Sequence, residues 1–291
     1  MNKDSNEYKI RRMIQGIGKI STLPTIFAKV NELLNDPTSS AHDLGKVISG
    51  DQGLTARLLR LVNSTFYGFP GKIDTVSHAV TIIGFRRLRE LVLGTSVLGM
   101  FKGLGDNISF RMEEFWKHSL ACGVASKVLA VYRREENPES YFVAGLLHDL
   151  GRLVLLESYS EKYREVFTIV QDRNALISEA EMDVFGFTHA EVAKELISFW
   201  RLPDSLQGAV GHHHNPQGGP ASSSYADMVH ISNILVHACK IGSSGERFVP
   251  PLSPGAWERV GLKKGILEPA FEKIYEQFED AFSFFVGPGQ G

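Results

Sequence analysis

The chain has 291 residues, 43% of them hydrophobic and 22% charged, which is an ordinary balance for a globular protein. Its net charge of −2 provides no overall field that would draw it to nucleic acid or to a membrane surface. Residues 1–108 carry 14 Lys and Arg against 9 Asp and Glu, so +5 there leaves −7 for the rest. This asymmetry predicts two lobes with different surfaces, but it is too weak to indicate DNA binding.

The two cysteines, Cys122 and Cys239, each lie in an apolar stretch with helical spacing. Two buried thiols in a chain of this length indicate a reducing compartment rather than a disulfide framework. The charged N-terminal segment lacks the apolar core of a signal peptide, and no stretch approaches the roughly 18 apolar residues of a membrane span. We therefore expect a cytoplasmic protein that does not associate with membranes.

Helical spacing of apolar residues dominates the first part of the chain. Pro24 stands at the first position of a predicted helix that carries Phe27 and Val30 on its apolar side. Ser40 and Asp43 have the spacing of a capping box, which predicts the start of a second helix. Further helices are expected at about 53–65, 75–83 and 85–100, the last two separated at Gly84.

A glycine-rich and polar stretch at 102–110 interrupts the helical pattern and marks the predicted boundary between two lobes. The predicted domains are an N-terminal helical lobe of residues 1–105 and a C-terminal helical lobe of residues 106–291. A final amphipathic helix is expected at about 264–285. No segment has the period-two alternation of a strand, so the predicted fold class is all-α.

Two helix starts in the second lobe matter for the site. Asn137 and Pro138 predict the start of a helix that continues without interruption through HDLGR at 148–152. The THAE motif that begins at Thr188 is a second predicted capping box. It places His189 in the first turn of the following helix.

Metal-ligand side chains recur in the second lobe, where five separate predicted helical segments supply them in order. The candidate ligands are His118, His148, Asp149, His189, His213, His214 and Asp227. Burying an ionised aspartate in an apolar helix is costly, and a divalent cation is the usual compensation. Gly145 and Gly151 leave the helix surface around the His-Asp doublet bare, with room for an ion and for neighbouring helices. A carboxylate that bridges two ions about 3.5–4 Å apart would satisfy this arrangement.

The donor types predict a divalent transition metal, most simply as two ions. Imidazole and carboxylate ligands without thiolate favour Fe or Mn, with Zn, Ni and Co as alternatives. Each residue also has a simpler explanation: a lone His-Asp pair more often forms a hydrogen bond, a histidine run suits the C-terminal end of a helix, and Asp227 could cap a helix. The complete set favours a metal site, and the remaining alternative is a constellation that holds no metal.

The ligand-bearing segments resemble the HD superfamily of metal-dependent phosphohydrolases. These segments are FWKH at 115–118, HDLGR at 148–152, FTHAEVAKELISFWRLP at 187–203 and GHHHNP at 211–216. The first lobe is similar to the HDOD branch in LPTIFAKV at 23–30, GDQGLTARLLRLVNSTFYG at 50–68 and IDTVSHAVTIIGFRRLRELVL at 73–93. The resemblance covers nearly the whole chain. It implies an all-helical fold whose C-terminal lobe is an HD-superfamily domain, and a role in bacterial signalling or regulation, often without demonstrated activity.

The related HD-GYP proteins, which hydrolyse cyclic dinucleotides, offer a comparison residue by residue. The positions that match their metal ligands are Glu114, His118, His148, Asp149, His189, His213, His214 and Asp227. That group has lysine where this chain has Arg152, and a DGSGYP loop where this chain has NPQGGP at 215–220. The loss of the loop argues against hydrolysis of cyclic di-GMP, and His212 has no counterpart.

Two functions compete. The first is a regulatory module whose metal site is structural or senses a ligand, with a signalling protein or a phosphorylated or nucleotide ligand as its partner. The second is a metal-dependent phosphohydrolase or phosphodiesterase acting on a nucleotide-like substrate. In that case His148 and Asp149 would hold the catalytic ions and Arg152 would clamp a phosphate oxygen. The sequence offers no strong candidate for the acid that protonates the leaving group, and His230, three residues after Asp227, is the one conceivable residue. The alternative for Arg152 is a surface ion pair.

A third function, nucleic-acid binding, is suggested by Arg86, Arg87 and Arg89, but such a cluster is more often a solvated helix face. The three aromatic residues in FYGFPG at 66–71 either form a partner surface or, as we expect, pack between the lobes. The sequence contains no recognisable sensor or output domain, so regulation is expected to act in trans.

Overall fold

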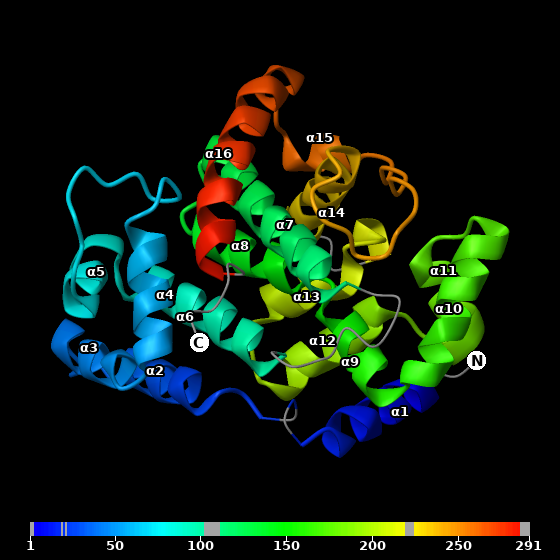
Figure 1. Cartoon of the computed structure of the whole chain (residues 1–291), viewed down its shortest axis with the longest axis horizontal. Coiled ribbons are helices and arrows are strands. Elements are labelled where there is room, and N and C mark those ends of the chain that lie inside the picture. Colours follow the sequence, from blue (N-terminus) through cyan, green and yellow to red (C-terminus); the bar gives the residue numbers. More distant parts are fainter. Residues whose placement is uncertain (1–2, 19, 21, 102–110, 219–223, 286–291) are drawn as a thin grey trace. The chain divides into compact units, whose positions relative to one another are not determined.

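The computed structural model describes residues 3–18, 20, 22–101, 111–218 and 224–285 (Figure 1). Every regular element within these ranges is a helix, which confirms the predicted all-α fold class. None of the described helices combines the length and the apolar character needed to cross a membrane.

The chain folds into two compact units, each assembled from two separate stretches of sequence. Unit 1 comprises Met1–Thr22 and Gly103–Ile266, and unit 2 comprises Leu23–Lys102 and Leu267–Gly291. The internal division lies close to the predicted lobe boundary. Unit 1 also includes the N-terminal segment Met1–Thr22, and unit 2 also includes the C-terminal segment Leu267–Gly291. The predicted domains 1–105 and 106–291 are each one continuous stretch and do not contain this exchange of terminal segments.

Unit 2 contains, among its described residues, α2 (Thr25–Asn35), α3 (Ala41–Ser49), α4 (Gln52–Val62), α5 (Val76–Ile83), α6 (Phe85–Met100) and α16 (Leu267–Phe285). Ser40 and Asp43 form the predicted capping box at the start of α3, since Ser40 N donates to Asp43 Oδ2 (3.0 Å) and Asp43 N to Ser40 Oγ (3.3 Å). Gly84, at φ 84°, separates α5 from α6 as predicted, because glycine adopts positive φ without strain.

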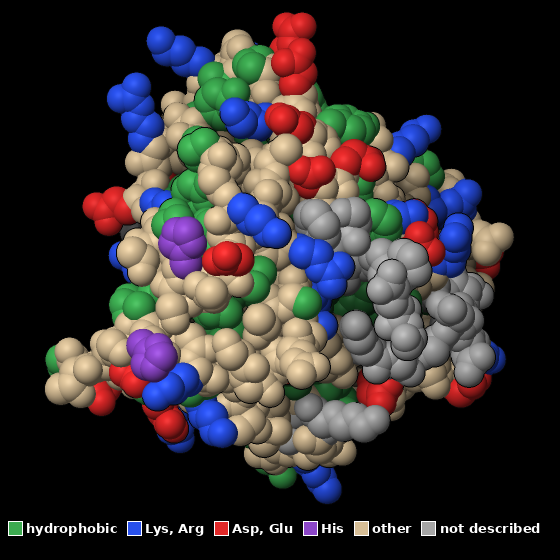
Figure 2. Space-filling view, turned by 60° about the vertical axis from the view of Figure 1, so that its left-hand side comes forward, with side chains coloured by type: hydrophobic (Ala, Val, Ile, Leu, Met, Phe, Trp, Pro, Cys, Tyr) green, Lys and Arg blue, Asp and Glu red, His purple; other side chains and the backbone are tan. Residues whose placement is uncertain are grey.

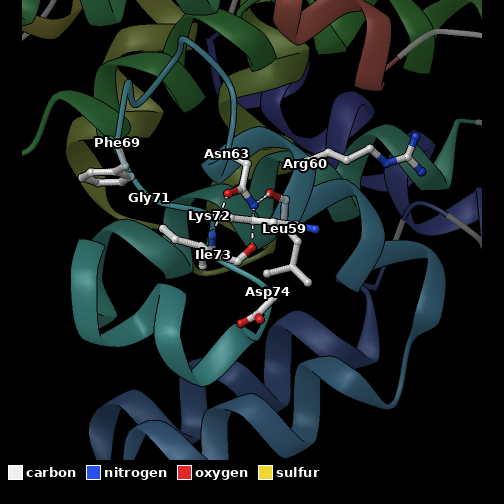
Figure 3. A pocket seen from close by; sticks show the side chains of 8 residues that line it. All are labelled: Leu59, Arg60, Asn63, Phe69, Gly71, Lys72, Ile73 and Asp74. Carbon is white, nitrogen blue, oxygen red and sulfur yellow. Dashed lines mark hydrogen bonds between the residues drawn. The ribbon is translucent and has the colours of Figure 1, made fainter.

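Asn63, directly after α4, anchors the turn at 66–71, which carries three aromatic residues and is called the aromatic turn below (Figure 3). Its Nδ2 donates to Leu59 O (2.7 Å) and Ile73 O (2.6 Å), and its Oδ1 accepts from Ile73 N (2.7 Å). Within the turn the rings of Tyr67 and Phe69 are stacked, with centroids 5.5 Å apart. Phe69 also lines a surface hollow of about 690 Å³. The aromatic side chains therefore pack on one another within unit 2.

Unit 1 contains, among its described residues, α1 (Lys3–Gly16), α7 (Met112–Arg133), α8 (Pro138–Leu147), α9 (Leu150–Ser158), α10 (Ser160–Arg173), α11 (Ile177–Phe185), α12 (His189–Phe199), α13 (Asp204–His212), α14 (Ser224–Ala238) and α15 (Ala256–Val260), with short 3₁₀ turns η1 (Pro216–Gly218) and η2 (Lys264–Ile266). Helix α7 is the core element, because every residue from His118 to Ala130 is buried. Helices α8 and α14 both pack against it.

Long-range packing of two amphipathic helices explains the composition of the units. In unit 1, α1 buries Ile10 and packs against α12, where Arg11 pairs with Glu195 at 2.9 Å. In unit 2, α16 packs against α4, and Asp280 Oδ2 accepts a 3.0 Å hydrogen bond from Thr65 N. An apolar helical stripe shows that a helix needs a partner but does not say which helix the partner is.

Charged side chains of both signs are mixed on the face drawn in Figure 2, and Lys and Arg do not gather into one continuous basic surface there. Arg89, from the arginine cluster of α6, lies 2.7 Å from Glu90 in an ion pair. Glu90 is buried and Arg89 is half-buried, so this arginine is engaged within unit 2.

Candidate metal centre

The His-Asp doublet lies in a turn between two helices. The predicted uninterrupted helix is wrong here, because α8 ends at Leu147 and α9 begins at Leu150. Asp149 adopts φ −94° and ψ 8°, in the bridge region of backbone conformation. Adjacent residues of a continuous helix point about 100° apart. The turn instead brings the two side chains together, with His148 Nε2 3.3 Å from Asp149 Oδ2.

Neighbouring helices fill the space that the glycines leave around this turn. A side chain on Gly151 would collide with the carbonyl of His189 in α12, and one on Gly145 would collide with the backbone of Cys122 in α7. Both helices therefore approach the doublet at backbone-contact distance. Their histidines reach it as a result.

Asp149 is the centre of the cluster, and a different pair of imidazoles faces each of its oxygens. Oδ1 lies 3.1 Å from His189 Nε2 and 3.6 Å from His213 Nε2. Oδ2 lies 3.3 Å from His148 Nε2 and 4.0 Å from His118 Nε2. All five side chains are at most 1% exposed. Five of the eight predicted ligands thus converge on one buried point.

His214 joins the cluster from the surface side and is the sixth predicted ligand to do so. Its Nε2 lies 2.8 Å from His189 Nε2, and its side chain is half-buried. It also lines a surface hollow of about 560 Å³, whose acidic lining residues are Glu179, Asp183 and Glu191. His214 therefore connects the buried cluster to solvent.

Hydrogen bonds fix the orientation of the imidazoles. His148 Nδ1 lies 2.7 Å from Gly145 O, and His213 Nδ1 lies 2.8 Å from Val210 O. Since a carbonyl can only accept, both rings carry their proton on Nδ1 and present the Nε2 lone pair to Asp149. These Nε2 atoms and both Asp149 oxygens are buried and have no hydrogen-bond partner among the described residues. A bound cation would satisfy such an arrangement of acceptors, so the donor set fits a metal.

A carboxylate outside the predicted set orients His189. Glu181 Oε2 lies 2.6 Å from His189 Nδ1 and accepts a 2.7 Å hydrogen bond from His189 N. Tyr163 Oη donates to the other oxygen, Oε1, at 2.6 Å. A carboxylate behind an imidazole is a common way to orient a metal ligand. No motif in the sequence identifies Glu181, which is found only by its position on α11 beside the start of α12.

Burial keeps most of these imidazoles neutral and so available as ligands. It lowers the pKa of His118, His213 and His214 well below the usual value for histidine. His189 differs: burial again acts to lower its pKa, but the carboxylates of Glu181 and Asp149 together outweigh burial and raise the pKa of His189.

Arg152 lies inside the cluster. Its side chain is 1% exposed, with Nε 3.2 Å from Asp149 Oδ1, Nη1 donating to Ser244 O at 2.5 Å, and Nη2 3.5 Å from Glu246 Oε1. Burial opposes the ionisation of Asp149, but Arg152 and then His148 outweigh it and hold the pKa of Asp149 well below its usual range. Arg152 is thus a buried counter-ion, and neither the predicted phosphate clamp nor a surface ion pair describes it.

Two predicted ligands lie outside the cluster. At the start of α14, Asp227 forms a two-pronged ion pair with Arg259, at 2.6 and 2.9 Å. Glu114 pairs with Lys117 at 3.0 Å. Neither acidic residue belongs to a candidate ligand group among the described residues. The structure thus places both residues outside the cluster, each paired with a neighbouring cation, and their assignment as ligands stays a prediction.

Other residues, absent from the predicted set, take part in the cluster near His118. Cys122, one turn further along α7, places its Sγ 3.5 Å from His118 Nε2. From α14, Asn233 Oδ1 lies 3.9 Å from that sulfur, and the ring of His237 lies 4.4 Å from the ring of His118. The spacing of four residues between Asn233 and His237 places both on one helix face, which is the signal that could have found them.

His230 has a positioning role. Its Nδ1 donates to His213 O at 2.7 Å, and its Nε2 accepts a 2.8 Å hydrogen bond from Ser253 N. With both ring nitrogens engaged it is not free to protonate a leaving group, contrary to the role suggested for it from the sequence. It holds the backbone that carries the His213 ring.

Comparison with known families identifies the fold. Residues 20–216 match the family model described as the HDOD domain. The chain belongs to the HDOD family. It is 26% identical over 206 residues to an uncharacterized protein of Treponema pallidum (strain Nichols), covering 70% of this chain and 39% of that protein. It is 26% identical over 153 residues to the uncharacterized protein YuxH of Bacillus subtilis (strain 168), covering 52% of this chain and 34% of YuxH. The HDOD chain thus spans less than two-fifths of either relative.

Solved structures share this HDOD fold. An HDOD domain protein of unknown function from Geobacter sulfurreducens has a TM-score of 0.82 at 24% identity, over 98% of this chain and 100% of that one. A protein from Shewanella amazonensis SB2B, provisionally named a phosphohydrolase, has a TM-score of 0.75 at 22% identity, over 94% and 98% of the chains. Another from that organism, provisionally named a metal-dependent phosphohydrolase, has a TM-score of 0.66 at 18% identity, over 97% and 99%. At these identities the likeness shows the fold alone.

Proposed function

We propose that this HDOD protein is a signalling module that holds a divalent transition metal in unit 1, and that the state of this centre regulates a signalling protein or responds to a phosphorylated or nucleotide ligand. The observation that carries the proposal is the position of Asp149, whose two oxygens face two different pairs of buried imidazoles. Apart from the Arg152 guanidinium, 3.2 Å from Oδ1, those oxygens face only imidazoles, and neither oxygen has a well-formed hydrogen bond among the described residues. A cation on each side would satisfy both oxygens.

The proposal places one ion on each side of Asp149. The first would be held by Oδ1 with three imidazoles, those of His189, His213 and His214, a group whose ligand atoms all lie within 4.8 Å of one another. The second would be held by Oδ2 with His118 and His148. Imidazole and carboxylate donors suit Fe or Mn, with Zn, Ni and Co as alternatives. Ions bound there would neutralise negative charge on the carboxylate and on any phosphoryl group that reaches them.

The chain's own residues prepare the centre. The carbonyls of Gly145 and Val210 and the Glu181 carboxylate each engage an Nδ1 atom, so the Nε2 atoms point inward. Arg152 neutralises part of the charge of Asp149, which allows the cluster to stay buried before an ion binds.

Access to the centre favours sensing over turnover. The five central side chains are at most 1% exposed, and the Arg152 guanidinium is committed to Asp149 rather than turned toward a ligand. The hollow beside His214 is lined by three acidic side chains: Glu179, Asp183 and Glu191. These features support a regulatory metal centre better than a nucleotide hydrolase.

Metal analysis of purified protein tests the proposal, with Asp149→Ala compared with Asp227→Ala. Asp227 is a matched control, since it lies in the same unit and is held by Arg259 outside the cluster. We expect up to two ions per chain in the wild type, retained in Asp227→Ala and lost from Asp149→Ala. Equal metal content in Asp149→Ala and the wild type, or a wild type that binds no ion after reconstitution, would overturn the proposal.

Phosphohydrolase activity is the alternative that the complete histidine set favours. It would be established if Mn²⁺-loaded protein turned over an activated phosphodiester and His148→Ala abolished the turnover. Equal rates in the two proteins would exclude this centre as the source of the activity.

A further inference from the structure

We infer that Cys122 is a thiolate ligand at the second metal position, together with His118 and His148. The inference rests on the proposed metal centre and makes it more specific, because it changes the donor set of one position from nitrogen and oxygen to nitrogen, oxygen and sulfur. Cys122 is fully buried on α7, one helical turn after His118.

The donor atoms are already spaced as ligands of one ion. His118 Nε2 lies 3.5 Å from Cys122 Sγ. In a tetrahedral site with metal–nitrogen bonds of about 2.0–2.1 Å and metal–sulfur bonds of about 2.3 Å, the nitrogen–sulfur separation is about 3.6 Å. One donor atom each from His118, Cys122 and His148 lie within 4.8 Å of one another.

A second observation, independent of the cysteine, points to a ligand at the same place. His148 Nε2 is buried and has no hydrogen-bond partner among the described residues, and its ring is held by the Nδ1 contact to Gly145 O. It lies 3.3 Å from Asp149 Oδ2, close to the nitrogen–oxygen separation of about 3.4 Å that the same bond lengths give. The unpartnered nitrogen therefore lies within reach of the shared carboxylate oxygen, and its residue belongs to the same donor group as the sulfur.

Charge supplies the chemical reason for a thiolate. Asp149 is the one carboxylate shared by both proposed positions, and Arg152 already lies 3.2 Å from its Oδ1. The first position has a second carboxylate, Glu181, behind His189, whereas the described contacts of His118 and His148 include no carboxylate besides Asp149. A thiolate at Cys122 adds a negative charge at the second position. When the ion binds, the S–H proton leaves to solvent, and Asn233 Oδ1, 3.9 Å from the sulfur, loses its weak donor.

The thiolate would also set metal preference. Sulfur ligands are soft and favour zinc and cobalt over manganese, whereas the first position, built from imidazoles and a carboxylate, keeps the preference for harder ions. The two positions would then differ in the ion they retain. The alternative is that Cys122 is a small packed residue that touches no ion, as buried cysteines often are.

The Cys239→Ser variant provides a clean test, because the chain has two cysteines and this substitution leaves Cys122 as its sole thiol. Cys239 is half-buried just after α14 and belongs to no candidate ligand group among the described residues. The variant is stripped with a chelator and titrated with Co²⁺, and its visible and near-ultraviolet spectra are recorded with the bound cobalt content. We expect a thiolate-to-cobalt charge-transfer band that saturates at one equivalent and disappears in Cys122→Ala/Cys239→Ser.

The outcomes separate this inference from the proposal beneath it. Cobalt retained by Cys239→Ser and lost from Asp149→Ala, without a charge-transfer band, would overturn the role of Cys122 and leave the metal centre standing. No retained cobalt in any of the proteins would overturn both. The decisive spectrum comes from Cys239→Ser, so the test holds even if the substitution at Cys122 prevents folding.

Discussion

Replacing Arg152 by Met removes a buried cation from beside Asp149 while keeping most of the side-chain volume. The guanidinium lies 3.2 Å from Asp149 Oδ1 and 3.5 Å from Glu246 Oε1, and it donates to Ser244 O at 2.5 Å. Without an ion in the centre, the substitution leaves Asp149 charged, buried and without its counter-ion. Removing one member of a buried ion pair typically costs about 3–5 kcal/mol. We therefore expect the metal-free variant to lose about 4 kcal/mol of unfolding free energy.

The position of the tryptophans makes this loss measurable in unit 1 alone. All three tryptophans lie in that unit, at Trp116, Trp200 and Trp257. Urea unfolding in chelator, followed by tryptophan fluorescence, therefore reports on the unit that contains Arg152. Arg164→Met is the matched control, since its ion pair with Glu161 is solvent-exposed and contributes less than about 1 kcal/mol.

Addition of metal sharpens the test. An ion bound at Asp149 supplies the charge that Arg152→Met has lost, and a ligand at about a thousand times its Kd stabilises the folded state by about 4 kcal/mol. Saturating Zn²⁺ or Mn²⁺ should therefore stabilise the variant at least as much as the wild type. If Arg152→Met in chelator lost less than about 1 kcal/mol of unfolding free energy, the same as Arg164→Met, Arg152 would not be a counter-ion of Asp149. The prediction that Arg152 contacts a ligand would then stand again.

Two further predictions concern the same unit. Burial lowers the pKa of His118, His213, His214 and His237, so the unfolded chain takes up protons first as pH falls below about 6.5. Metal-free unit 1 should lose about 4 kcal/mol of unfolding free energy between pH 7 and 5.5, with the raised pKa of His189 offsetting part of the effect. Urea midpoints that do not change over this range would contradict it. Gly242→Ala, at φ 65° and against the backbone of His118, should cost at least about 2 kcal/mol and lower metal content. Gly261→Ala, at φ 72° with the Glu258 carbonyl oxygen 4.0 Å from the added Cβ, should retain its metal. Equal metal loss in both variants would contradict the claim that Gly242 positions His118.

Much of the candidate site was predictable because its residues carry strong local signals. The capping box at Thr188 fixes His189 in the first turn of α12, and the predicted box forms. Asp227 is a residue for which local sequence signals were not enough. It precedes Asn233 by six residues on α14, which places it about 9 Å away along the helix axis and on a different side of the helix. The order of residues alone could not show that Asn233, and not Asp227, reaches the cluster.

The remaining errors have physical causes that a linear pattern does not contain. The apolar run around His148 predicts one helix, but Asp149 breaks it in order to face two sets of imidazoles. Arg152 looks like a surface residue one turn beyond the doublet, yet contacts with Glu246 and Ser244, far along the chain, draw it inward. Long-range contacts also decide which unit α1 and α16 join.

Unit 2 is built from two separate stretches of sequence, so during translation it cannot be completed until the intervening segment of unit 1 has been synthesised. Helix α4 emerges before the whole of Gly103–Ile266, and its partner α16, with buried Ile274 and Phe278, emerges after it. At about 5–20 residues per second, translation of that insert takes roughly 10–30 s. Throughout this interval the nascent unit exposes the side of α4 that α16 will cover, a period in which binding by a chaperone would be most useful.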